Sequence, residues 1–508
     1  MPLPNITVNR SQGNIVRPAL SNDATSAMLF YSNTYPSGFS GATQVAVVYS
    51  TNEAYNLGIV DDYSTETKAT STITINTAYT GLTAVSLTSN FPTASTEVVA
   101  AFTFSATGTA SQATELALLI NNGLVYSASA TNNVVTVTAQ QSSDTQLVGA
   151  NINTKTLALS APANANVTIT AFSGGTSTDV RPWAYHIAEH FRLGNGKLFI
   201  GVFPVPATFN FNEIKTVQDF ANGEIRQCGV YKSGSWSGVF SATDVTSIQT
   251  VCNTLGNEKH PLSVVLQPNL NGVALNSLPN LQAYSAPNVS VLIGQDGFNV
   301  GAAIANVFTY SVGMMGAVTG VLSQFRVSDS IAWVGKLQSL PFSTAELDTP
   351  AFANKTLVSN TSTALQDTLA DKHYTYLRRI PDLSGSFISD SKTAVSNTNS
   401  FFSIERNRTI DKARRVVAAG LSPLLNSPVD VEASGKLSAL TINVYKQVCN
   451  SQLDVMVSNQ ELSAYQVNID PDQNVLATDT LNITLVLVPK GVARFITVDV
   501  SFGVIASA

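Results

Sequence analysis

The spacing of apolar residues predicts alternating strands and helices between residues 179 and 345. An amphipathic stretch over 182–193 predicts a helix, and the apolar run 198–203 that follows it predicts a strand. The same alternation continues with a helix over 245–255 and strands over 262–266 and 289–293. Strands and helices that alternate in this way are typical of an α/β layer with a largely parallel sheet.

A different pattern occupies residues 67–178, where apolar residues recur at every second position. Ile73 and Ile75 are one example, and Asn132-Asn133 separates two such runs as a hairpin turn would. A single helical pattern over 113–120 interrupts the strands. We predict an inserted β-rich domain that carries no chemical motif.

The stretch 297–325 contains no charged residue and is long enough to cross a bilayer. It also contains several Asn, Thr, Ser and Gln side chains, which disfavour a membrane span. Gly313, Gly316 and Gly320 suit close packing against a neighbouring element. We therefore predict a buried helix and no membrane insertion.

The last zone, 346–508, mixes both periodicities. Thr409 is a candidate cap for a helix whose apolar positions run from Ile410 to Leu424, and a second helix is expected over 437–457. Two strands, over 481–488 and 494–504, close the chain and are joined by the turn residues 489–491.

The final predicted strand has one wholly apolar face. Its members are Ile496, Val498, Val500 and Phe502. A strand at the terminus is free to pair with another chain, and such an edge favours aggregation unless a partner covers it. Pairing within its own subunit is the alternative.

Composition excludes several classes of function. Apolar residues make up 44% of the 508, enough for a sizeable core, whereas charged residues make up only 12% and leave a net charge of −6. Without a basic stripe, a nucleic-acid partner is not expected. Three scattered cysteines favour a reducing compartment, and residues 1–30 lack the pattern of a secretory signal. No motif indicates a cofactor.

One segment has the spacing of a zinc hydrolase. His186, Glu189 and His190 form H-x-x-E-H, which on a helix presents two imidazoles one turn apart with a carboxylate as general base. The alternative is an amphipathic helix that buries Trp183 and Ile187, with the histidines beside the apolar stripe.

The only concentration of basic residues lies near the predicted helix at 410–424. It includes Lys412, Arg414 and Arg415, but Glu405 and Asp411 are interspersed. Such mixing favours salt bridges or a protein contact over nucleic acid.

Three segments of the C-terminal third form a recognisable pattern: YTYLRRIPDLSGSFISDSKT (374–393), IERNRTIDKARRVVAAGLSPLLNSPV (404–429) and AYQVNIDPDQNVLATDTLNITLVLVPKGVARFITVDVSF (464–502). Together they resemble the contractile tail sheath family of phage tails and related injection systems. Upstream, HFRLGNGKLFIGVFP (190–204), SQFRVSDSIAWVG (323–335) and QVAVVYSTNEAYNLGI (44–59) are similar to sheath segments. Residues 67–178 depart from the family pattern.

With the resemblance, we expect an α+β or α/β multidomain chain with a mixed sheet core, flanking helices and extended terminal β-arms. Its expected parts are an N-terminal arm and the start of the sheath core (1–66), an inserted β-rich surface domain (67–178), an α/β sheath domain (179–345) and a C-terminal sheath core with a terminal β-arm (346–508).

The resemblance implies a structural subunit without enzyme activity, which polymerises around an inner tube and contracts to drive it through a target envelope. Its partners would be copies of itself in stacked six-membered rings, the tube protein, and the baseplate and tail terminator proteins. Its location would be a virion tail or a contractile particle in the host cytoplasm. A zinc hydrolase, or a surface adhesin that binds through 67–178, are the alternative functions.

By that analogy, strands from both termini would add to neighbouring subunits. The residues expected in these contacts are Ile6 and Val8 near the N-terminus and Ile496, Val498, Val500 and Phe502 at the C-terminus. Lys412, Arg414 and Arg415 are expected to face the inner tube.

Overall fold

The computed structural model describes most of the chain. The described residues are 22–61, 67–80, 84–90, 95–123, 125–139, 152–160, 167–175, 180–234, 236–238, 240–308, 310–343 and 346–500. The predicted arm positions Ile6, Val8 and Phe502 therefore lie outside them.

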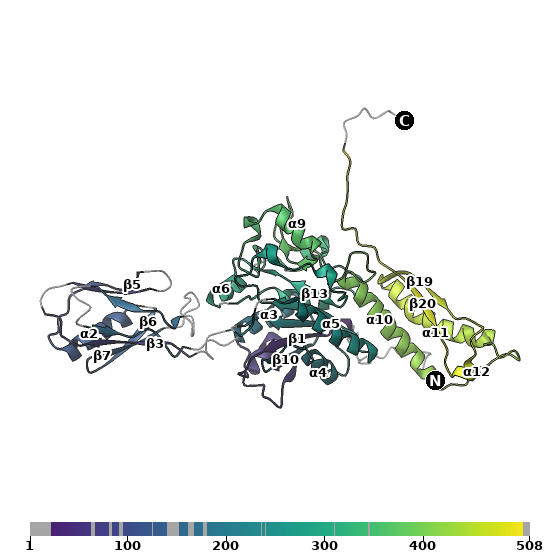
Figure 1. Ribbon diagram of the computed structural model, residues 1–508, viewed down its shortest axis with the longest axis horizontal. Helices are drawn as coiled ribbons and strands as arrows, with labels where there is room; N and C mark the ends of the chain where they lie inside the picture. Colours follow the sequence, from purple (N-terminus) through teal and green to yellow (C-terminus); the bar gives the residue numbers. More distant parts are fainter. Residues whose placement is uncertain are drawn as a thin grey trace, which may run out of the picture.

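A mixed sheet of seven strands, the central sheet, forms the middle of the molecule (Figure 1). Its strands are all parallel to their neighbours except β2, which runs antiparallel to β10. In spatial order they are β16 (Tyr374–Thr375), β13 (Val289–Leu292), β12 (Ser263–Pro268), β11 (Gln227–Lys232), β1 (Ser26–Tyr31), β10 (Leu198–Phe203) and β2 (Val45–Val48). The predicted α/β fold with a largely parallel sheet is confirmed, and the sheet draws strands from three of the four predicted parts of the chain.

Helices cover both faces of the central sheet because its inner strands are buried on both sides. In β1, Met28 and Phe30 point into one core cluster with helix α3 (Val180–Leu193), whereas Ala27 and Leu29 point into another. That second cluster includes apolar residues of α4 (Glu213–Phe220) and α5 (Ala242–Asn257). This two-sided burial explains the continuous apolar runs of the parallel strands.

The uncharged stretch forms two helices, so the predicted single helix over 297–325 is wrong. Helix α6 ends at Val307 (Val300–Val307) and α7 begins at Met315 (Met315–Gln324). Between them the amide oxygen of Gln295 accepts from the N–H groups of Val312 and Gly313, both at 3.2 Å. Gly313 has a φ of +84°, and an added Cβ there would collide with the carboxamide of Gln267. Side-chain amides of neighbouring strands thus replace the helical hydrogen bonds.

Helices α3 and α7 pack closely through glycine, as the small residues predicted. A Cβ at Gly316 would collide with the carbonyl oxygen of His186, and one at Gly320 would meet the backbone of His190. The missing side chains therefore let the two helix backbones approach each other.

Residues 70–175 contain two small sheets with their own core, which Figure 1 draws apart from the central sheet. One has the order β6-β7-β3-β9 and the other β5-β4-β8, and α2 (Thr109–Asn121) packs against them. The predicted hairpin is confirmed, since Thr131 pairs with Val134 across Asn132-Asn133. The strands are β3 (Thr70–Ile75), β4 (Val85–Ser89), β5 (Thr96–Phe102), β6 (Tyr126–Thr131), β7 (Val134–Ala139), β8 (Leu157–Leu159) and β9 (Val167–Ile169).

The C-terminal unit consists of α10 (Ile404–Leu421), α11 (Ala439–Ser458) and the antiparallel pair β19 (Leu462–Asn468) and β20 (Thr484–Pro489). Helix α10 begins at Ile404, so the predicted cap at Thr409 is wrong. The extra first turn forms because Ile404 packs into the core of the central sheet, whereas Ala413 and Val417 pack against α11 and β19. One helix thus belongs to both cores.

The remaining elements are short and connect these layers. They are α1 (Thr51–Asn56), β14 (Gly294–Asp296), α8 (Val334–Gln338), β15 (Pro350–Phe352), α9 (Thr363–Asp371), β17 (Leu377–Arg378), β18 (Phe387–Ile388) and α12 (Val475–Thr478). Five turns of 3₁₀ helix are also described, at Asn22–Ala24, Leu275–Ser277, Leu281–Ala283, Val358–Asn360 and Ser422–Leu424. Within the described residues, every helix is too short or too polar to cross a membrane.

Candidate assembly site

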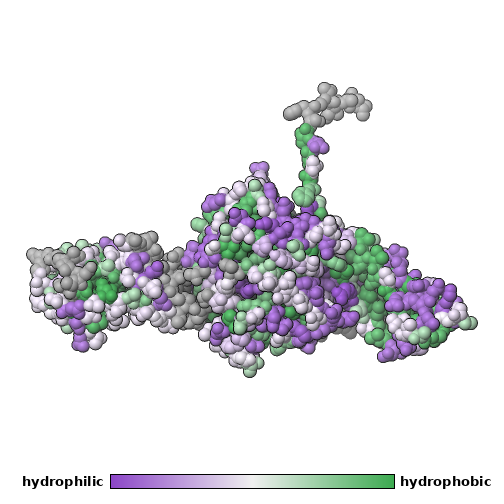
Figure 2. Space-filling model, viewed as in Figure 1, coloured by the Kyte–Doolittle hydropathy of each residue, from purple (hydrophilic) through white to green (hydrophobic). Residues whose placement is uncertain are grey.

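The chain beyond β20 leaves the body of the molecule as an extended segment, residues 495–500, which we term the C-terminal arm (Figure 1). The predicted strand over 494–504 finds no partner strand among the described residues. The apolar side chains at Phe495, Ile496, Val498 and Val500 are between 74% and 93% exposed. Figure 2 shows the projecting segment as mainly hydrophobic.

Such exposure is unusual because burying an apolar side chain away from water lowers the free energy of the protein. Ile496, Val498 and Val500 lie at alternate positions, so an extended backbone presents them on one face. An unpaired apolar strand is a template for pairing with another chain. The arm therefore has the chemistry of a strand that lacks its sheet.

The β19–β20 pair offers matching free edges. Each strand has one partner within the described part of the chain, so each retains one edge that no described strand covers. Leu485 and Leu487 pack against the core of the C-terminal unit, while Val486 and Val488 remain 48% and 47% exposed. A further strand beside this pair would find both backbone hydrogen-bonding groups and apolar side chains to contact.

The three basic residues expected to face the tube differ in exposure. The Nζ of Lys412 lies 2.6 Å from the carboxylate of Asp23 and 2.5 Å from that of Glu461. Arg415 reaches Asp23 at 2.7 Å, whereas the Arg414 side chain is 51% exposed and lies 3.6 Å from Asp411. Lys412 and Arg415 thus hold α10 to the segment before β1, and a contact with a tube stays a prediction for all three.

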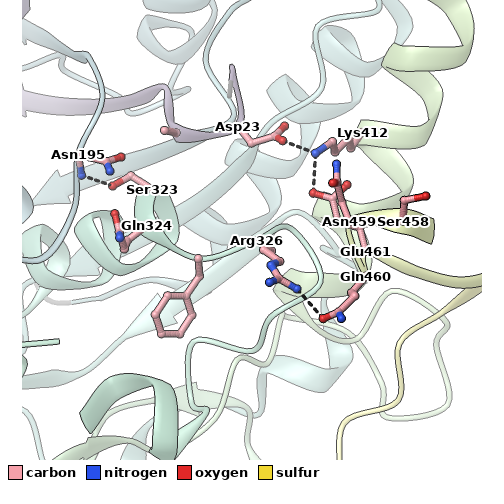
Figure 3. A pocket seen from close by; sticks show the side chains of 12 residues that line it. Asp23, Asn195, Ser323, Gln324, Arg326, Lys412, Ser458, Asn459, Gln460 and Glu461 are labelled. Carbon is pink, nitrogen blue, oxygen red and sulfur yellow. Dashed lines mark hydrogen bonds and ion pairs between the residues drawn. The ribbon is translucent and has the colours of Figure 1, made fainter. Parts of the chain in front are cut away.

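Lys412 and its partners Asp23 and Glu461 border a crevice of about 510 Å³ between the body and the C-terminal unit (Figure 3). The charged side chains that line it all have partners. Lys412 binds Asp23 and Glu461, and Arg326 donates to the side-chain oxygen of Gln460 at 2.9 Å. Burial raises the pKa of the Glu461 carboxyl although Lys412 lowers it. The sequence did not reveal this crevice because its residues come from distant segments.

Burial has a similar effect on Asp411. The pKa of this carboxyl rises to about 6, since loss of solvent outweighs the attraction of Arg414 and Arg415. The buried charges therefore align α10 with the body at a cost in solvation, which is the usual balance for a buried ion network.

The H-x-x-E-H segment is a structural part of α3. His186 accepts a hydrogen bond at Nδ1 from the N–H of Gly316 at 3.1 Å and donates from Nε2 to the carbonyl of Val312 at 3.0 Å. Both imidazoles are fully buried, which lowers each pKa to about 3. Glu189 is held by Arg192 at 2.5 Å. Because both nitrogens of His186 are engaged, this segment does not form a zinc site.

A second cluster contains residue types that bind metals, but the ammonium of a lysine already binds its carboxylates. Within the described residues, Asp219, Glu258 and His260 have ligand atoms within 4.8 Å of one another. The Nζ of Lys215 lies 2.6 Å from Glu258 and 3.1 Å from Asp219. The lysine therefore supplies the positive charge that these carboxylates require.

Comparison with known proteins gives matches to family models and to solved structures. The model described as DUF2586, N-terminal domain, matches residues 96–392, and that of DUF2586, C-terminal domain, matches residues 401–506. No curated protein matches the chain significantly.

Similar solved structures include contractile sheaths. The helical sheath of the anti-feeding prophage in its contracted state is 14% identical over 63% of this chain and 81% of that chain, with a TM-score of 0.45. The contracted sheath complex of the extracellular injection system PVC is 12% identical over 63% and 80%, with a TM-score of 0.43. The sheath tail protein of Listeria innocua is 9% identical over 92% and 94%, with a TM-score of 0.38. Since the N-terminal domain model alone matches more than half of the residues, the chain belongs to the DUF2586 family.

Proposed function

We propose that the chain is a structural subunit of a contractile sheath, which polymerises around an inner tube and contracts to drive it through a target envelope. The observation that carries the proposal is the C-terminal arm, whose alternate apolar residues are exposed and unpaired beside a subunit that has free strand edges. The sequence segments that resemble sheath proteins support it, since 404–429 and 464–502 make up most of the C-terminal unit and its arm.

In this proposal the arm of one subunit adds as a strand to the β19–β20 pair of a neighbouring copy. Each main-chain hydrogen bond contributes only about 0.5–1.5 kcal/mol, so the linkage must recur around a ring and along the particle. The bonds would hold subunits together while their bodies rotate, and contraction would release free energy as new interfaces form.

The partners follow from the same role. They would be further copies of this chain in stacked six-membered rings, the tube protein, and the proteins at the baseplate and the tail end. The site of action would be a tail particle, in a virion or in the host cytoplasm. We propose no catalytic role, and 67–178 would be a domain on the outside of the particle.

Deletion of the last twelve residues, 497–508, tests the arm. We expect the full chain at high concentration to form hollow striated tubes in negative-stain electron microscopy, and the deletion to leave folded, unassembled subunits. Unchanged tube formation after deletion would contradict strand exchange through the arm. Monodisperse particles from the full chain at every concentration would count against autonomous polymerisation.

A matched pair of variants separates side-chain contacts from chain length. Ile496→Ser with Val498→Ser changes the apolar face of the arm, and Thr497→Ser with Asp499→Asn changes the opposite face. We expect the first pair to reduce tube yield strongly and the second to leave it near that of the unmodified chain.

A further inference from the structure

The arm departs from the body at one residue, Arg494. Its Nε lies 3.0 Å from a carboxylate oxygen of Asp390, and one Nη lies 2.7 Å from a carboxylate oxygen of Glu405. The same Nη donates to the hydroxyl of Ser391 at 3.1 Å. The guanidinium also lies over the ring of Phe402, 5.1 Å from its centre. We term these contacts the Arg494 clamp.

The clamp is mostly shielded from water, whereas the next residue is not. The Arg494 side chain is 17% exposed and that of Glu405 is 3% exposed, but Phe495 is 93% exposed. Glu405 lies in the first turn of α10 and also accepts from Ser391 at 2.6 Å. The base of the arm is thus bound to α10, the helix that belongs to both cores. Guanidinium–carboxylate pairs fix the relative orientation of the two groups in addition to pairing their charges.

Without the clamp, the chain itself offers the arm another place to bind. Strand β20 ends at Pro489, and Lys490 and Gly491 begin a connection of four residues to Arg494. Connections of this length join the strands of many hairpins. An arm that turned back would find the free edge of β20 and its exposed side chains Val486 and Val488. In Figure 1 the chain beyond β20 instead runs away from the β19–β20 pair.

We propose that the Arg494 clamp keeps the arm from closing onto β20 of its own chain, so that both the arm and the strand edge stay available to neighbouring copies. Arg494 is in this sense a positioning residue, because it directs the arm without contacting the neighbour. The inference rests on the proposed function, since it deepens the exchange of arms between copies. It explains why β20 and the arm, which are joined by only four residues, do not form a hairpin.

Hydrogen exchange of the backbone amides of 495–500 tests the clamp in the diluted, unassembled full-length chain. We expect rapid, unprotected exchange in the unmodified chain and at least tenfold slower exchange in Arg494→Ala, because the closed arm would form strand hydrogen bonds. Arg494→Lys keeps the positive charge and should restore most of the rapid exchange. Arg379→Ala, which removes an exposed arginine outside the clamp, is the matched control and should behave like the unmodified chain.

Tube formation gives the second readout. At equal protein concentration, Arg494→Ala should lower tube yield at least tenfold, while Arg494→Lys and Arg379→Ala retain it. Should Arg494→Ala fail to fold, Asp390→Asn removes one partner of the clamp and should give intermediate protection of 495–500.

The outcomes distinguish the clamp from the proposed function. If the arm in folded Arg494→Ala exchanges as fast as in the unmodified chain, the clamp is overturned even if tubes form normally. If Arg494→Ala does not fold, the same result in Asp390→Asn overturns the clamp. If protection of 495–500 rises but the unmodified chain forms no tubes, the clamp is supported and the proposed autonomous polymerisation fails.

Discussion

Strand β1 and the C-terminal arm are apolar segments of equal length with opposite environments. All six residues of β1 are buried, with β10 and β11 paired on either side. All six residues of the arm are exposed, and none has a described strand beside it. An apolar extended sequence therefore specifies that a strand will be covered, but not whether the cover comes from its own chain or from another.

The largest effect on folding is expected in β1. Phe30→Ala in β1 should lower the free energy of unfolding by about 3–5 kcal/mol, because it removes a fully buried ring. That ring stacks on Trp183 with 5.0 Å between the ring centres. Urea unfolding followed by circular dichroism measures the change. A loss below about 1 kcal/mol would mean that β1 does not depend on burial in the way the comparison requires.

The second prediction concerns the contact of α3 with α7, which supports one face of β1. Gly316→Ala should destabilise the chain by about 1–3 kcal/mol, since its Cβ would collide with the His186 carbonyl oxygen. Gly256→Ala in α5 is the matched control, because an added Cβ there meets nothing within 4 Å. The control should be neutral or slightly stabilising. Equal melting temperatures for the two variants would argue against close helix packing.

The third prediction concerns pH. Burial lowers the pKa of His186 and His190 to about 3 in the folded chain, against 6.5 for an ordinary histidine. The unfolded chain therefore binds more protons between pH 6.5 and 3, so their contribution is complete above pH 6.5 and decreases as pH falls. Each histidine should contribute about 1.4 kcal/mol per pH unit in that window.

Unfolding by urea at several pH values between 4.5 and 7 measures this slope. The double variant His186→Gln with His190→Gln removes both titrating groups and should flatten the dependence. The same steep slope in the double variant would assign the effect to other residues. The deletion 497–508 removes no histidine and is the matched control, with an unchanged slope.

The smallest effect on folding is expected in the arm. Phe495→Ala changes a side chain that is 93% exposed, so the free energy of unfolding should stay within about 0.5 kcal/mol. Its effect should fall on tube yield instead, because the side chain acts only between copies. Destabilisation of the isolated subunit beyond about 1 kcal/mol would mean that the arm is covered by its own chain.

Element type could be predicted from the chain where periodicity was strong. The helix expected over 182–193 is α3, the strand over 198–203 is β10, and the hairpin at Asn132-Asn133 has its turn in the expected place. The errors came where tertiary contacts replaced local ones. Gln267 and Gln295 interrupt the uncharged stretch, and the core contact of Ile404 extends α10 toward the N-terminus.

The candidate site was only partly accessible from the sequence. The apolar face at Ile496, Val498 and Val500 follows from alternation alone, but its exposure does not. Lys412 and Arg415 were expected on a partner-facing surface, yet both bind Asp23, which is nearly 400 residues earlier in the chain. No local pattern reveals such a pairing.

The sequence by itself determined the mixed α/β fold, the β-rich composition of 67–178 and the apolar alternation of the arm, because these depend on residue periodicity within a short window. Only the tertiary structure decided that H-x-x-E-H is a packed helix and that Arg494, at the base of the arm, pairs with Asp390 and Glu405. Those outcomes depend on which distant groups bind the imidazole nitrogens of α3 and which distant carboxylates bind Arg494. Hydrogen bonds between distant segments do not change the local spacing of residue types.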